Sequence, residues 1–400
     1  RPFEALRGEL ADALAVVRQA ADVHGAGVVM IGILPTLRAG DLQCSAMSDS
    51  MRFRALSAAL AKRRRELIRL QISGADPLEL TCDDVTFEGA ASSMQVHLRV
   101  EPTGFARTYN AAQLATAPAL AASCNSPTLL GHRLWEETRI ALFMQAVDDR
   151  DRRARRRGKP ARVSFGSDWV QSGALELFEK NVSLHAPLLP VVGSEDPISC
   201  VEGGGVPELD ELRLHHGTVW HWNRAIYSPA ENGHLRIEMR ALPAGPSPSD
   251  MIANSAFLVG LVLGMAPDAE RWIRTMPFEQ AEHNFYRAAR EGLSARLLWP
   301  PAPGEAPVEV GARELVLELL PLARRGLDRA RVDPQESEEQ LAVIEARVRQ
   351  SRTGAAWQRL ALGALEPRLG RREALAALLE DYRRHSDGDQ PVHSWPLAVG

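Results

Sequence analysis

The stretches GTVWHWNRAIY (217–227) and HLRIEMRAL (234–242) decide the fold prediction for this chain. Both alternate apolar and polar residues over much of their length, which is the two-residue period of a half-buried strand. Between them, Glu231-Asn232-Gly233 has the Asn-Gly chemistry of a hairpin turn. The two stretches therefore predict an antiparallel hairpin with one apolar face and one polar face.

The polar face of the second strand carries Arg236, Glu238 and Arg240, while positions 235, 237 and 239 are apolar. A carboxylate between two guanidinium groups suits a site that holds Mg²⁺ and phosphate together, because hard cations bind carboxylate oxygen and guanidinium pairs with phosphate. Cross-strand ion pairs on an exposed sheet face are the plainer interpretation. The spacing alone favours that plainer interpretation.

A third strand is predicted at residues 93–100, where MQVHLRV (94–100) alternates in the same way. Gln95, His97 and Arg99 share its polar face. A single histidine on a strand is more often structural than a ligand, so the spacing alone favours a structural His97. A further strand, predicted at 78–81, lies on the other side of an acidic turn at Asp83-Asp84 and is a candidate to pair with it.

The first strand of the hairpin also carries aromatic side chains. Trp220 and Trp222 are predicted to share a face with Arg224, where they could pack an adenine ring, although aromatic pairs on strands are more often core residues. Histidines at 215, 216 and 221 have no further His or Cys partner at metal-site spacing, so a zinc site is disfavoured.

Outside these strands the apolar periodicity is mainly helical. It predicts helices at 3–24, 51–70, 109–122, 134–148 and 251–265, a buried strand at 28–34 and a solvated loop at 148–160. Ser249-Asp250 is the expected cap of the helix at 251–265. Beyond the Pro-rich PPAPGEAP (300–307), helices are predicted at 310–329, 336–349, 355–365 and 371–384.

These elements predict an α+β fold with a sheet-containing domain at residues 1–300 and a helical region at 308–390 packed on it. The chain enters its first helix without an initiator methionine, which predicts that its natural start lies upstream and that the first domain is truncated.

The amino-acid composition favours some classes of protein over others. The 400 residues are 45% hydrophobic and 24% charged with a net charge of −4, which fits a soluble globular protein and disfavours a nucleic-acid binder. The four cysteines form no Cys-x-x-Cys pair, so a reducing cytoplasm is the expected location. The most apolar stretch (251–266) is shorter than the ~20 residues needed to span a bilayer, which favours a buried helix over a membrane span.

Four motifs occur in an order and spacing typical of one enzyme family. They are HGTVWHWNR (216–224) with GHLRIEMRALP (233–243), SSMQVHLRV (92–100), NSPTLLGHRLWEETR (125–139) and IGILP (31–35). On these motifs, over residues 3–270, the chain resembles the type 2 glutamate–cysteine ligases and related bacterial carboxylate–amine ligases. Leu34 and Trp222 stand where many bacterial relatives have polar residues, which predicts an altered substrate choice.

The resemblance implies a curved antiparallel sheet of the glutamine synthetase-like type, backed by helices, with Mg²⁺ and ATP on its open face. It implies that the substrate carboxylate attacks the γ-phosphate of ATP and that an amine then displaces phosphate from the acyl phosphate. The default substrates are glutamate and cysteine, as in glutathione biosynthesis, and a homo-oligomer is left open.

Residue roles follow from the resemblance by position. Glu238 and Arg240 are the implied catalytic pair, with Glu238 on the metal and Arg240 on the phosphates. The remaining implied roles are metal binding for His97, nucleotide contacts for Gln95 and Trp220, and substrate-carboxylate binding for Arg139 and Arg224.

Two alternatives to a ligase stay open at this point. One is a non-catalytic relative that binds an amino acid or a nucleotide. The other is a kinase of the same superfamily that phosphorylates a carboxylate or guanidino group without joining it to an amine.

Overall fold

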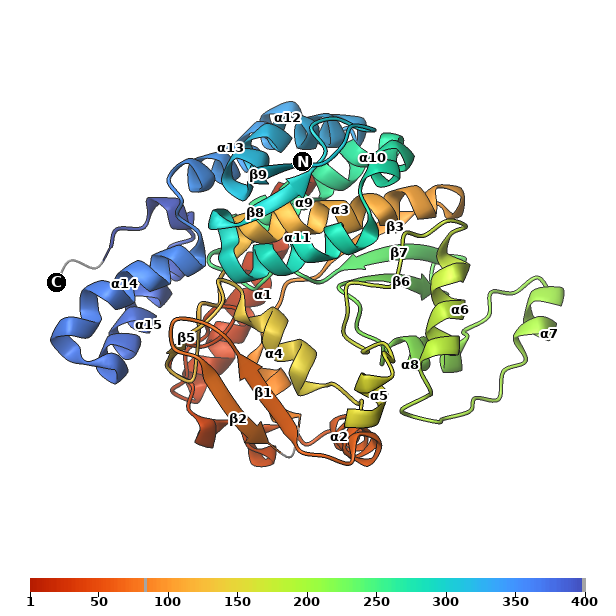
Figure 1. The fold of residues 1–400 in the computed structure, drawn as a ribbon, viewed down its shortest axis with the longest axis horizontal. Coiled ribbons are helices and arrows are strands. Elements are labelled where there is room, and N and C mark those ends of the chain that lie inside the picture. The colour runs from red at the N-terminus through yellow and green to blue at the C-terminus, as the bar shows by residue number, and fades with distance from the viewer. Residues whose placement is uncertain (83–84, 398–400) are drawn as a thin grey trace.

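The computed structural model describes residues 1–82 and 85–397, and its central sheet has three antiparallel strands (Figure 1). They are β3 (Val96–Val100), β7 (His234–Met239) and β6 (Asn223–Ser228), in the order β3-β7-β6. The predicted hairpin and the third strand are confirmed, although each strand is shorter than predicted. The turn between β6 and β7 contains Glu231, Asn232 and Gly233, all with positive φ, as a tight hairpin requires.

Two long helices share one hydrophobic core with the apolar face of this sheet. They are α3 (Phe105–Ser123) and α9 (Pro248–Met265), and the buried Ile237 and Met239 of β7 belong to the same cluster. The helical run Pro248–Thr275 is long and apolar enough to cross a membrane, but 78% of its apolar window is buried inside the protein. The predicted buried helix is therefore confirmed. Its N-cap is Ser247, two residues before the predicted cap Ser249-Asp250, and the Ser247 side chain accepts a hydrogen bond from the Asp250 N–H.

The C-terminal helices are confirmed as α12 (Ala312–Arg329), α13 (Pro334–Arg349), α14 (Gly354–Leu369) and α15 (Arg371–Asp387). Helix α12 packs closely on α9 at two glycines, Gly326 and Gly260. A Cβ at Gly326 would clash with the Gly260 carbonyl oxygen. The Pro-rich segment 300–307 is the turn between β8 (Arg296–Trp299) and β9 (Val308–Gly311), which pair with each other. Helix α12 therefore belongs to the main core and is not set apart from it by a linker.

Helices α14 and α15 form the lobe on the left of Figure 1. This lobe has its own aromatic core of Trp357, Tyr382 and Trp395, and Ile31 from the N-terminal half packs into it. Segment 28–34, which was predicted to be a strand, has no strand assignment. Gly32 in this segment makes two backbone hydrogen bonds. Its N–H donates to Asn125 O, and its carbonyl oxygen accepts from the Ser92 N–H.

The predicted helix at 51–70 is two elements in the structure. Helix α2 (Met51–Arg64) ends where Arg65 takes a left-handed conformation, with φ of 58°, and β1 (Ile68–Ile72) follows. Strand β1 pairs with β2 (Leu78–Cys82), so the predicted strand at 78–81 exists but pairs with β1 rather than with residues 93–100. The predicted acidic turn at Asp83-Asp84 lies outside the described residues.

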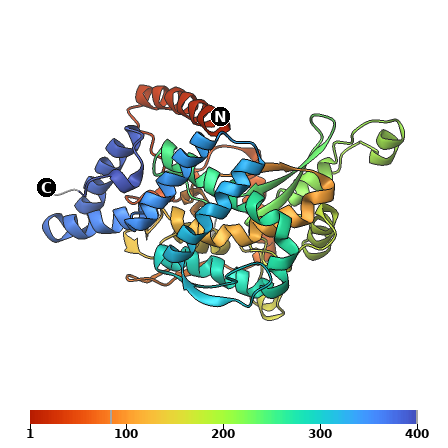
Figure 2. The same ribbon diagram turned by 90° about the horizontal axis from the view of Figure 1, so that it is seen from above.

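Three smaller differences concern helices. Helix α1 (Pro2–Val23) is confirmed, but Phe3 is its one buried residue, and Figure 2 shows the helix on the outside of the molecule. Helix α4 (Thr138–Ala146) is shorter than predicted, and the predicted loop at 148–160 contains a short helix, α5 (Arg152–Arg156). The remaining elements are α6 (Ala174–Leu184), α7 (Pro197–Glu202), α8 (Asp210–His216), α10 (Ala269–Thr275), α11 (Phe278–Glu291), β4 (Thr128–Leu129) and β5 (His132–Arg133).

Candidate functional site

Glu238 lies at the centre of the polar face of the sheet, between its two register partners. His97 on β3 and Arg224 on β6 both lie opposite Glu238 on β7. The Arg224 Nε donates to Glu238 Oε2 at 2.6 Å, and the His97 Nε2 lies 3.4 Å from Oε1. Only 4% of Glu238 is exposed. The alternating pattern of the three strands thus brings a histidine, a carboxylate and a guanidinium into one row.

The charges around Glu238 keep it ionised. Burial alone would raise the pKa of its carboxyl group, but Arg224, Arg240 and His97 outweigh burial and lower that pKa below its ordinary value. Burial lowers the pKa of His97, and the nearby Glu238 only partly opposes this. The row therefore presents a carboxylate whose two oxygens are already in contact with protein groups.

Arg240 is the least satisfied cation of the site. Its Nε lies 3.6 Å from Glu238 Oε2, beyond hydrogen-bond distance, and its guanidinium stacks over the ring of Phe143 at 5.6 Å. Among the described residues, neither its Nε nor its Nη1 has a hydrogen-bond partner, although both atoms are buried. Burial and the nearby Arg224 lower its pKa to about 10. A buried guanidinium with two free donors is poised to bind an anion.

Further cations extend this face along the sheet. A cavity of about 250 Å³ is lined by Arg213, Arg224 and Arg236 together with Tyr227. Arg99, at the edge, pairs with the exposed Glu231 at 2.6 Å. The face is therefore electropositive next to one buried carboxylate, as expected of a surface that binds phosphate.

The predicted nucleotide contacts, Gln95 and Trp220, lie at the margins of this face. Gln95 is exposed, immediately before β3. Trp220 is partly buried, with its ring 6.2 Å from that of Phe143, and Trp222 is packed between Phe143 and Phe285. Their roles toward a nucleotide stay predictions.

Arg139, the predicted substrate clamp, is an internal brace in the structure. Its side chain is 2% exposed; Nε donates to Glu137 Oε1 at 2.8 Å, and Nη2 donates to Ala241 O at 2.6 Å. These contacts hold the chain just after β7, and so they position Arg240 from behind. Binding of a substrate carboxylate by Arg139 stays a prediction, and the contacts seen here favour Arg224 over it for that role.

Asn125, the first residue of the NSP motif, also serves the architecture. Its Nδ2 donates to Ala244 O and to the Tyr382 hydroxyl, and its Oδ1 accepts from Gln358 Nε2. The motif thereby ties the end of the sheet strand to α14 and α15. Its position in the sequence shows no sign of this, because the partners lie more than 100 residues away.

We expect Asn125→Ala to lower the free energy of unfolding by about 2–3 kcal/mol, because several buried hydrogen-bonding groups lose their partner. Urea unfolding measures this change. The exposed amide variant Gln43→Ala serves as the control and is expected to stay within about 0.5 kcal/mol of the parent. An equal, small effect of both substitutions would contradict the bracing role.

His216 and His221 form a hydrogen-bonded group with Asn181 of α6, and the ring of His185 lies near that of His221, with centroids 6.2 Å apart. Asn181 contacts His216 Nδ1 at 2.6 Å and His221 Nε2 at 3.1 Å, and Ser164 contacts His221 Nδ1. Burial is the main cause that lowers the pKa of His185 and His216 to about 4 and that of His221 to about 3. These rings are therefore neutral in the folded protein at neutral pH.

This group predicts a loss of stability in mild acid. Below about pH 6.5, the ordinary histidine pKa, the unfolded chain binds protons that the folded chain does not. Each buried histidine then lowers the free energy of unfolding by up to about 1.4 kcal/mol per pH unit, until the pH nears its folded-state value. Urea unfolding at pH 7, 6 and 5 measures the slope. His221→Asn is expected to make the slope shallower, and an unchanged slope would contradict the assignment.

The side chains on the polar face of the sheet could hold Mg²⁺ only together with phosphate. Mg²⁺ is usually held by one or two carboxylates, substrate phosphates and water. In the part of the chain that the structure describes, no three His, Cys, Asp or Glu side chains converge on one metal position. Glu238 would supply the carboxylate, and the free donors of Arg240 suit phosphate oxygens. The residues thus fit a metal–nucleotide complex rather than a metal caged by protein alone.

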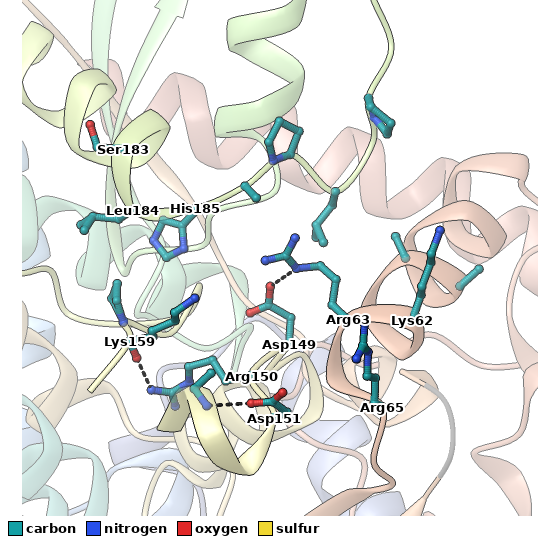
Figure 3. Close-up of a pocket in the computed structure, with 18 residues that line it drawn as sticks. Lys62, Arg63, Arg65, Asp149, Arg150, Asp151, Lys159, Ser183, Leu184 and His185 are labelled. Carbon is teal, nitrogen blue, oxygen red and sulfur yellow. Dashed lines mark hydrogen bonds and ion pairs between the residues drawn. The ribbon is translucent and has the colours of Figure 1, made fainter. Parts of the chain in front are cut away.

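Two features of possible functional interest were missed in the sequence. The first is a cavity of about 950 Å³ between the end of α2 and residues 183–190, where Figure 3 shows Lys62, Arg63 and Arg65 on the opposite side of Asp149 from His185. Arg63 is paired with Asp149 at 2.9 Å. The second is Glu88. Desolvation raises the pKa of its carboxyl group, and the positive charge of Arg240 only partly opposes this. Neither stands in a motif, because each depends on contacts between distant segments.

Comparison with known proteins agrees with the geometry. The model of glutamate-cysteine ligase family 2 (GCS2) matches residues 2–381, which includes both the sheet and the C-terminal helices. No curated protein matches the chain. The polar sheet face of the chain carries the carboxylate and arginines that the resemblance implied. Because the match spans nearly the whole chain, the chain belongs to glutamate-cysteine ligase family 2.

Proposed function

We propose that this protein is an ATP-dependent carboxylate–amine ligase that forms a γ-glutamyl amide through an acyl phosphate. Family membership supports carboxylate–amine ligase activity in general. The proposal adds ATP and Mg²⁺, the acyl phosphate, a glutamate-like first substrate, and a sheet of the glutamine synthetase-like type.

One observation carries the proposal: Arg240 is buried with two unpaired donors beside an ionised carboxylate. Leaving these donors unpaired costs about 1–3 kcal/mol each, or more for a charged group. Arg240 has two such atoms, whereas the buried Arg347, which pairs with Asp250, has one. The arrangement is explained if the donors bind the phosphate oxygens of a substrate.

The residues divide the work as follows. Arg240 and Arg224 bind the transferring phosphoryl group, whose charge is spread over its oxygens as the substrate carboxylate attacks and ADP leaves. Glu238 orients Arg224 through the 2.6 Å hydrogen bond. Glu238 would hold a bound Mg²⁺ together with phosphate and water, and the ion would supply positive charge against the phosphate oxygens. The amine then attacks the acyl carbon, and phosphate departs from it.

ADP release with Mg²⁺-ATP, glutamate and a panel of amines tests the proposal. Release that requires both glutamate and an amine is the expected result. Release with a carboxylate alone that no amine stimulates would indicate a kinase, and ATP binding without any release would indicate a non-catalytic relative.

A further inference from the structure

An apolar cavity of about 520 Å³ adjoins the polar sheet face. It lies between α2, η2 (Cys44–Ala46), η3 (Thr86–Ala90) and the segment that precedes β6. Its volume falls within the range of about 300–1,000 Å³ that is usual for small-molecule sites. Apolar side chains make up most of its wall: Met47, Phe53, Leu56, Phe143, Leu189 and Trp220.

Phe143 joins this cavity to the proposed phosphate site. The Arg240 guanidinium lies over the Phe143 ring, 5.6 Å from its centroid. The Trp220 ring lies edge-on to Phe143, with the two ring centroids 6.2 Å apart. Phe143 and Trp220 both line the cavity. Phe143 therefore contacts both a molecule inside the cavity and Arg240, the cation that is proposed to hold the phosphoryl group.

Glu88 is one of the polar residues in this wall, which also include Asp41 and Arg52. It lies on η3, which is anchored by the buried Phe87 and Ala90, and it lines the same cavity. Among the described residues its carboxylate makes no ion pair, and Arg240 is the charge that acts on it. The residue as a whole is exposed, but the protein around its carboxyl group desolvates that group and raises its pKa, so it accepts a proton more readily than a fully solvated glutamate.

We propose that this cavity binds the amine substrate, that the amine carries a branched alkyl or aromatic group rather than the short thiol of cysteine, and that Glu88 holds its ammonium. The inference rests on the proposed ligase function and names the substrate class of the same site. A cysteine side chain would leave most of the apolar wall unfilled, whereas a larger apolar group removes that wall from water.

The chemistry balances with the groups at hand. Glu88 takes one proton from the ammonium, which frees the nitrogen lone pair. The lone pair forms the C–N bond with the acyl carbon while the C–O bond to phosphate breaks, and its electron pair leaves with phosphate. The second amine proton goes to the departing phosphate, so no further reactant is needed.

Turnover and binding are both needed for the test. With Mg²⁺-ATP and glutamate, hydroxylamine captures an acyl phosphate as a hydroxamate and needs no apolar pocket. The kcat/KM values for phenethylamine, isoamylamine, ethylamine and cysteine are then compared with that for hydroxylamine. Calorimetric titration of phenethylamine into the protein measures binding without turnover.

We expect phenethylamine or isoamylamine to exceed ethylamine and cysteine in kcat/KM by at least about ten-fold, as a few methylene groups in an apolar pocket allow. Ala46→Trp fills the cavity from an exposed position and is expected to lower the ratio of phenethylamine to hydroxylamine kcat/KM by at least about ten-fold. Glu88→Gln is expected to weaken phenethylamine binding. Ala13→Trp, at an exposed site on α1, is the control and should leave the ratio unchanged.

Cysteine turnover equal to or above that of the bulky amines would overturn the inference and leave the ligase function intact. Absence of hydroxamate with glutamate would count against the proposed function. In that case the titration decides: phenethylamine binding that is lost in Ala46→Trp supports the pocket, and no binding to the parent protein overturns it.

Discussion

Replacing Glu238 by glutamine is expected to lower glutamate- and amine-dependent ADP release by about 10²–10³-fold or more. Glutamine keeps the size of the side chain but removes the charge that orients Arg224 at 2.6 Å and lies 3.6 Å from Arg240. It also removes the carboxylate that would bind Mg²⁺. The effect should fall on kcat and on the affinity for Mg²⁺-ATP, and both are measured by following ADP release over a range of Mg²⁺-ATP concentrations.

The same substitution should cost stability. Glu238 is the common partner of Arg224, Arg240 and His97, and its side chain is 5% exposed. Without it, like charges remain close together in a buried place, and breaking a buried pair in this way costs about 3–5 kcal/mol. Urea unfolding measures the loss.

Glu231→Gln is the matched control for Glu238→Gln. Glu231 also pairs with an arginine, Arg99 at 2.6 Å, but its side chain is 70% exposed. Exposed pairs contribute less than about 1 kcal/mol, so both stability and ADP release should stay near the parent values. If Glu238→Gln kept ADP release within ten-fold of the parent, the reactive centre would have to lie elsewhere.

Arg240→Met is expected to separate activity from stability. ADP release should fall by about 10²–10³-fold, because the two donors proposed for the phosphoryl group are gone. The free energy of unfolding should stay within about 1 kcal/mol of the parent or rise, because a buried cation with unpaired donors next to Arg224 is replaced by an apolar side chain of similar length. Glu238 keeps Arg224 and His97 as partners.

Thermal or urea unfolding together with ADP release tests this pair of expectations. Arg296→Met, at an exposed position on β8 where Arg296 pairs with Glu309 at 2.8 Å, is the control and should leave both properties nearly unchanged. A variant that loses several kcal/mol of stability but retains ADP release would show that Arg240 is a structural cation. That result would remove the observation on which the proposed function rests.

The strands of the central sheet and its β6–β7 hairpin could be predicted because their signal is local, whereas the pairing of β3 with β7 was not predicted. Alternation along residues 94–100 and 234–239 places apolar side chains on one face of each strand, and the hairpin turn sets the register of β6 against β7. The hairpin thus brings Arg224 opposite Glu238, whereas His97 joins them only through the long-range pairing of β3 with β7. The same logic failed at 51–70, where no Gly or Pro marks the boundary and a non-glycine residue, Arg65, ends the helix in a left-handed conformation.

The environment of the site could not be predicted in this way. Arg139 was expected at the substrate, a role that stays a prediction, and its contacts with Glu137 and Ala241 could not be foreseen from the motif. Glu88 carries no motif and acquires interest only because η3 folds back toward Arg240. In both cases the role of the charge depends on which distant segment excludes water from it.

Strand alternation and helical periodicity thus determine which residues line each face, because a side chain's direction repeats every two or 3.6 residues whatever the rest of the chain does. The tertiary structure decides which of those charges are paired, which are left with free donors like Arg240, and which apolar walls enclose a cavity beside them. These outcomes depend on burial and on contacts across hundreds of residues, and electrostatic free energies change most where water is excluded.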